Sequence, residues 1–141
     1  MTASRLLFFA IVFMGSFANA QSINKTEPQQ FWDTHILAIL DKDVERVIDQ
    51  SIFPMETFEG EWSKKDFRDA FDIIFDATTL EALGNQSYRD IDSYDDGDGL
   101  VYMVVISTST EIDGELYESA LILSFSKFDK DWKLFKIDVA G

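Results

Sequence analysis

The sequence predicts an α+β domain in which helices from the first half of the chain pack on an antiparallel sheet from the second half. Between residues 28 and 76, apolar side chains recur every three or four positions, as in helices with one buried face. From Leu100 onward, long runs of β-branched, aromatic and aliphatic residues favour strands. Asp113-Gly114 separates two of these runs, and this dipeptide is the strongest short-range hairpin signal.

The first twenty residues have the layout of a secretory signal peptide. A single arginine, Arg5, precedes an apolar run from Leu6 to Met14, and an Ala-Asn-Ala triplet ends at Ala20. The apolar run has nine residues, against the roughly 20 that a membrane-spanning helix requires. We therefore expect cleavage after Ala20, export to the periplasm or the medium, and no stable membrane anchor.

The remainder of the chain is expected to form one domain. Residues 21–27 are polar and suit a flexible leader, and the apolar patterning runs from residue 28 to residue 141. A chain of this length buries roughly two-thirds of its unfolded surface, which is enough for a core without disulfides. The sequence contains no cysteine, so neither a disulfide nor a lipid-modified cysteine is available.

The charge of the chain is strongly negative. It carries 26 acidic and 12 basic residues, a formal net charge of −14. Such a charge repels nucleic acid and anionic membranes, and it favours solubility and a basic protein partner. Residues 89–118 alone hold nine acids and one base.

Each predicted helix has a recognisable start. Pro28 suits the first turn of a helix, Asp43 can cap a second, short helix, and Ser63 with Asp66 forms a variant of the capping box before a third. The predicted buried stripes of the first and third helices consist mainly of large apolar residues: Trp32, Ile36, Ile39 and Leu40, and then Phe67, Ala70, Phe71, Ile74 and Phe75.

The hairpin around Asp113-Gly114 predicts which strand residues share a face. The bulkier face, which should meet the helices, contains Tyr102, Val104, Ile106 and Thr108 with Ser119, Leu121, Leu123 and Phe125. The other face carries smaller side chains and could be a partner surface. In the last predicted strand, "WKLFKIDVA", a one-residue shift would exchange Leu134 and Phe135 between faces, so its register stays open.

The stretch "DIDSYDDGDGL", residues 90–100, raises the question of a calcium loop. With Gly97 at the sixth position of an EF-hand loop, Tyr94 falls at the third position and Met103 at the twelfth, where oxygen ligands are required. Aspartate and glycine also suit a tight turn between strands. We therefore predict a turn, with no metal site and no cofactor.

Few residues suggest chemistry. His35 is the only histidine and lies on or beside the first helical stripe, where it could be a general base, orient a ligand, or be an ordinary core residue. Asp138 could point to either face of the last strand. The weak candidates for catalysis are His35, Tyr102 and Asp138, and those for ligand binding are Trp32, His35, Trp62, Tyr102 and Tyr117.

Taken together, these segments resemble the nuclear transport factor 2-like, or cystatin-like, α+β cone superfamily. The resemblance rests on "FWDTHILAILDKDVERVID", "FPM", "KKDFRDAFDIIF", the long hairpin and "WKLFKIDVAG". It implies a curved antiparallel sheet wrapped around helices, a pocket between them, and a homodimer formed through the sheet. Enzymes of this superfamily place an Asp or His acid/base pair in the pocket, and His35 alone matches, with Tyr102 or Asp138 as a second member.

Three functions are compatible with these features. The first is an exported, non-enzymatic binding domain that holds a small ligand or a protein in the pocket or on the sheet face. The second is a small-molecule isomerase or lyase with His35 as general base. The third is an inhibitor or immunity-type protein whose acidic segment, from Asp90 to Glu118, covers a basic protein partner.

Overall fold

The computed structural model describes residues 25–86 and 90–141. The predicted signal peptide, its cleavage site and the first part of the leader lie outside these ranges. The described residues form four helices, α2 (Glu27–Leu40), α3 (Val44–Asp49), α4 (Lys64–Ile74) and α5 (Ala77–Gly84). They also form six strands, β1 (Ser51–Thr57), β2 (Gly60–Trp62), β3 (Ile91–Asp95), β4 (Leu100–Ile112), β5 (Glu115–Phe128) and β6 (Asp131–Ala140).

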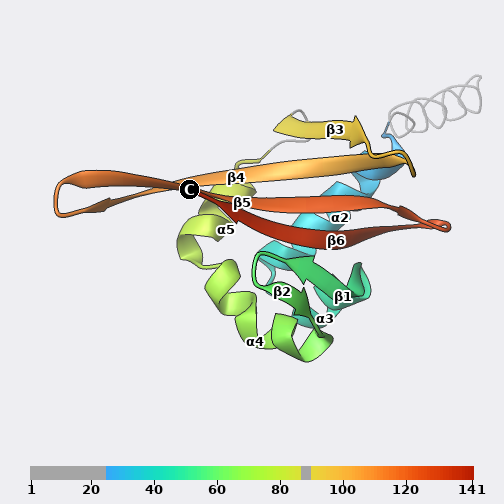
Figure 1. Cartoon of the computed structure of the whole chain (residues 1–141), viewed down its shortest axis with the longest axis horizontal. Coiled ribbons are helices and arrows are strands. Elements are labelled where there is room, and N and C mark those ends of the chain that lie inside the picture. Colours follow the sequence, from blue (N-terminus) through green and yellow to red (C-terminus); the bar gives the residue numbers. More distant parts are fainter. Residues whose placement is uncertain (1–24, 87–89) are drawn as a thin grey trace, which may run out of the picture.

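The six strands belong to one sheet in the order β2-β1-β6-β5-β4-β3. In Figure 1, β1 and β2 lie beside α3 and α4, while α2 passes behind β5 and β6. The predicted α+β class, with helices packed on a curved sheet, is confirmed. Among the described residues no helix is long and apolar enough to cross a membrane.

The sheet is mixed rather than wholly antiparallel. The meander from β3 to β6 is antiparallel, as predicted, and so is the β1–β2 pair, but β1 runs parallel to β6. The two strands of this parallel pair are separated in sequence by two helices and four strands, so no hairpin constrains their relative direction. The extended segment predicted around Pro54 is thus part of an inner strand of the sheet.

The predicted register of the long hairpin is confirmed. Tyr102 pairs with Phe125 and Thr108 with Ser119. Asp113 and Gly114 have φ values of 53° and 80°, as a turn with positive φ at both central residues requires. In β6 the open register is settled by burial: Leu134 is completely buried opposite Phe125, and the pairing shifts between Ser124 and Phe125.

Helix starts follow the predicted chemistry. The Asp43 side chain accepts a hydrogen bond from the Arg46 backbone amide, and Ser63 and Asp66 form a complete capping box. Helix α5 is an additional helix that the sequence analysis does not predict. Asp76 caps it, accepting from the Thr79 amide at 2.8 Å.

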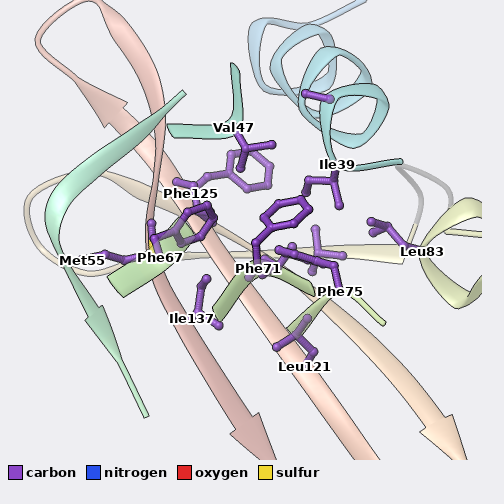
Figure 2. Packing of buried hydrophobic residues seen from close by; sticks show 14 of the residues in the cluster. Ile39, Val47, Met55, Phe67, Phe71, Phe75, Leu83, Leu121, Phe125 and Ile137 are labelled. Carbon is purple, nitrogen blue, oxygen red and sulfur yellow. The ribbon is translucent and has the colours of Figure 1, made fainter. Parts of the chain in front are cut away.

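The interior between the helices and the sheet is filled by large apolar side chains (Figure 2). Phe67, Phe71 and Phe75 follow one another from α4, with successive ring centroids 5.9 and 5.0 Å apart. On the sheet, Phe125 is fully buried and is flanked by the rings of Trp32 and Tyr102. The bulkier face of the hairpin therefore meets the helices, as the sequence predicts.

Candidate functional site

His35 lies inside the domain. Helix α2 places it on its inner face, where it is completely buried, and its ring stacks on Phe31 at a centroid distance of 5.0 Å. Its Nδ1 lies 2.7 Å from the Oε1 atom of Gln50, at the end of α3. Because an amide oxygen can only accept, Nδ1 donates this hydrogen bond.

The other ring nitrogen of His35, Nε2, is buried and has no hydrogen-bond partner among the described residues. With the proton on Nδ1, Nε2 carries a lone pair in apolar surroundings. Burial lowers the pKa of His35 from 6.5 to about 4, and the hydrogen bond with Gln50 opposes this effect only in part. The imidazole is therefore neutral at neutral pH.

Aromatic rings surround His35, which contacts both Phe31 and Trp32. Two other sequence candidates, Trp32 and Tyr102, gather nearby, and each stacks on the ring of Phe125. A hollow of about 340 Å³ opens at the start of α2, but it is lined by the neighbours of His35, among them Phe31 and Gln50, and not by His35 itself. Gln50 therefore stands between the imidazole and this hollow.

The remaining candidates lie elsewhere. Asp138 pairs with Ile122 on the face of the sheet away from the helices, and its carboxylate is 3.3 Å from the Lys136 Nζ atom. Trp62 is buried at the entrance of α4 against Phe58.

Tyr117 shares the face of Tyr102, as predicted. It lies about 25 Å further along the sheet, given the length that a strand spans per residue. The structure thus brings Trp32, His35 and Tyr102 together, and leaves Asp138, Trp62 and Tyr117 apart from them.

The acidic stretch of residues 90–100 consists of strand β3 and a turn at residues 95–99, where the turn is predicted. The turn joins β3 to β4, and two of its carboxylates accept backbone hydrogen bonds, Asp95 from Gly97 at 2.8 Å and Asp96 from Asp98 at 2.9 Å. No group of three or more potential metal ligands occurs among the described residues. The prediction of a turn is confirmed.

The most distinctive surface of the molecule is the end of the β4–β5 hairpin. Strand β6 ends where Ala140 pairs with Ala120, while β4 and β5 continue together to Ile112 and Glu115. We call residues 108–119, which extend past this point, the arm. Figure 1 shows the arm reaching beyond the helices and the other strands.

The arm carries a distinct set of side chains. Three large apolar residues are more than half exposed there: Ile112 at 53%, Leu116 at 64% and Tyr117 at 52%. The arm also contains four acids and no base: Glu111, Asp113, Glu115 and Glu118. Side-chain contacts order it: the Thr108 and Ser119 hydroxyls are 3.0 Å apart across the two strands, and within β5 the Tyr117 hydroxyl donates to Glu115.

Two hollows adjoin the root of the arm. One, of about 390 Å³, lies under the arm against α4 and α5 and is bordered by Phe58, Ile73 and Val139. The other, which we call the edge hollow, has a volume of about 490 Å³ and lies at the step where β6 ends beside β5. Its lining is mostly small: Ser107, Ser109, Glu118, Ala120, Ala140 and Gly141.

The acids of residues 90–118 do not form one face. The turn at residues 95–99 and the arm lie at opposite ends of β4, whose 13 residues span roughly 40 Å. A partner would therefore meet one acidic group or the other. The arm was not predicted from the sequence, although one feature of the sequence indicates it. The two predicted hairpin strands are longer than the last predicted strand, and this difference indicates that the hairpin extends past that strand.

Comparison with known proteins adds no relatives. No model of a protein family, no curated protein and no solved structure matches the chain.

Proposed function

We propose that this protein is a non-enzymatic binding domain that engages another protein through the arm. The observation that carries the proposal is the exposure of Ile112, Leu116 and Tyr117 at the end of a projecting hairpin. Large aromatic and aliphatic side chains are the usual anchors of protein interfaces, and here they are available on both faces of the arm.

The packing of the interior supports binding over catalysis. None of the three hollows described above is lined by His35, and its hydrogen-bond partner is the amide of Gln50, not an ionisable group. A general base must reach the proton that it removes, directly or through one water. The isomerase or lyase alternative, which depends on His35, therefore has less support than binding at the surface.

Export is the second part of the proposal. It rests on the sequence of residues 1–20, which has the charge, apolar run and small-residue triplet of a cleavable signal. We accordingly place the binding partner in the periplasm or outside the cell.

A shortened variant tests the proposal. Deleting Ser109–Ile112 and Glu115–Glu118 removes four residues from each strand and leaves Asp113-Gly114 as the turn, so the alternation of the ladder is kept. We expect the intact protein to capture partners from the exported fraction that the shortened variant does not capture. Identical capture by the two proteins, with the variant folded by circular dichroism, would contradict the proposal.

A further inference from the structure

We infer that the arm binds an extended segment of its partner as an added strand along the free edge of β5. Four consecutive residues of this segment are basic, apolar, apolar and basic, in that order. The inference rests on the proposed binding function and adds the partner's chemistry and mode of docking. It depends on three observations: an open strand edge, a hollow beside it, and the order of side chains along it.

Within the described residues, the edge of β5 is open beyond its last pair with β6, which joins Ala120 to Ala140. Gly141 lies against the backbone of Glu118 and Ser119, and Glu115–Glu118 pair only with β4. Backbone groups of alternate residues in this segment face outward, and an unpaired edge is a template for another strand. Four residues accommodate a short added strand of about 13 Å.

The edge hollow supplies room beside this segment. Residues of β4, β5 and the end of the chain line it, and Glu118 lies there among small residues. The Ser, Ala and Gly side chains leave space for the side chains of an incoming strand. On the other edge of the arm, β4 presents Thr108, Ser109 and Thr110 followed by Glu111 and Ile112, so it offers one charge and one large apolar side chain where β5 offers two of each.

The order of residues on β5 specifies the partner. Glu115 and Tyr117 point to the helix side of the sheet, and Leu116 and Glu118 point to the other side. Side chains directly opposite on neighbouring strands contact one another, and opposite charges or paired apolar groups stabilise the pair. The four partner residues opposite Glu115, Leu116, Tyr117 and Glu118 should therefore be basic, apolar, apolar and basic.

This order is the same read in either direction, so it holds for parallel and antiparallel addition. A second copy of the chain is a poor occupant of this edge, because the arm contains four acids and no base and two arms would repel each other. The partner is therefore a different protein with an exposed lysine- or arginine-bearing segment.

The probe is a dye-labelled, end-capped peptide, Thr-Lys-Val-Val-Lys-Thr, with Thr-Glu-Val-Val-Glu-Thr as its control. Fluorescence anisotropy with the intact protein should show binding of the lysine peptide that weakens as salt rises, and at least tenfold weaker binding of the glutamate peptide. Equal affinity for the two peptides, or no binding of either, would overturn the inference.

Backbone pairing is tested with two further lysine peptides, methylated on one or the other alternate set of amide nitrogens. Only one set faces β5 in an added strand, so one methylated peptide should keep its affinity and the other should lose it. Equal affinities for the two would show that the segment does not add as a strand.

Substitutions in the protein locate the site. The double change Glu115→Gln and Glu118→Gln should weaken binding of the lysine peptide about fivefold, as expected for two exposed ion pairs. The matched control, Glu59→Gln with Glu61→Gln, changes two exposed acids at the opposite edge of the sheet and should leave binding unchanged. Equal losses in both variants would contradict the site.

The two proposals can fail separately. If the lysine peptide does not bind but capture from the exported fraction still depends on the arm, the binding function stands and strand addition is wrong. If capture does not depend on the arm, the binding function itself is wrong.

Discussion

The two ends of strand β5 differ sharply in their surroundings. We call the domain without the arm the body. In the body, Leu123 and Phe125 are fully buried beneath the helices, whereas on the arm Leu116 and Tyr117 are more than half exposed. The residue types are similar, and both segments belong to one continuous ladder with β4. The body is therefore stabilised by burial, while the arm depends on cross-strand pairs.

This contrast distinguishes residues that stabilise the fold from exposed residues that are available to bind a partner. Exposed Ile112, Leu116 and Tyr117 contribute little burial to the domain, so substitutions there should be tolerated. Apolar side chains at the end of a projecting hairpin are a liability for solubility unless a partner covers them. The four acids of the arm lower that liability and also restrict the partner.

The largest expected effect comes from truncating Phe125. Its side chain is completely buried and contacts Trp32 and Tyr102, so Phe125→Ala should lower the free energy of unfolding by about 3–5 kcal/mol. Leu116→Ala, on the arm of the same strand, should change it by less than about 0.5 kcal/mol. Urea denaturation followed by tryptophan fluorescence measures both.

Because Phe125→Ala could prevent folding, Phe125→Leu provides a milder comparison and should lie between the two. Similar losses for Phe125→Ala and Leu116→Ala would show that the arm is packed against the body in solution.

The next largest effect is the dependence of stability on pH, which arises from a residue of the body. In the unfolded chain His35 takes up a proton near pH 6.5, but in the fold burial lowers its pKa to about 4. Stability is therefore complete above pH 6.5 and is lost as the pH falls from 6.5 toward 4. Between pH 7 and 5.5 the protonation of carboxylates changes little. Over this range the free energy of unfolding should fall by about 1 kcal/mol because of His35.

The control for this effect is His35→Leu, which removes the titrating group. We expect the variant to lose its dependence on pH between pH 7 and 5.5, whatever its absolute stability, as measured by urea denaturation at each pH. An unchanged dependence would mean that His35 is accessible to water and protonates in the folded protein.

A pair of identical substitutions compares the two regions directly. Ser63→Ala removes the capping box of α4 and should cost about 1 kcal/mol, because the Asp66 amide loses its acceptor. Ser109→Ala lies on the arm and should cost less than about 0.5 kcal/mol. Thermal unfolding by circular dichroism checks both, and a larger effect at Ser109 would contradict the division into body and arm.

The smallest effect is expected from shortening the arm itself. Deleting Ser109–Ile112 and Glu115–Glu118 removes no residue of the core cluster and restores a two-residue turn, so the midpoint of thermal unfolding should shift by only about 2–4 °C. A shift of 10 °C or more would show that the arm supports the body, and the binding function would then lose its main argument.

Much of the fold could be read from local chemistry. The Ser63–Asp66 capping box, the Asp43 cap and the Asp113-Gly114 turn each depend on residues within a few positions of one another, and all three were predicted. The hairpin register followed from the turn, because strict alternation leaves no freedom once the central pair is known. The missed helix α5 shows the limit, since Asp76 suited both the end of one helix and the cap of the next.

The candidate site was much harder to predict. Trp32, His35 and Tyr102 were named from their types and faces, and the fold does gather them, but as packed neighbours of Phe125. Whether such residues surround a space or fill it depends on the volumes of side chains from distant elements. No pattern in any one segment contains that information.

Local periodicity and turn chemistry were thus sufficient for the class of fold, the helix starts and the faces of the long hairpin, because these depend on short-range geometry. Long-range contacts settled the parallel pairing of β1 with β6, the inward position of Leu134, and the point at which β6 stops beside β5. That last feature leaves the arm uncovered, because a strand edge is open or closed only according to which other strand reaches it.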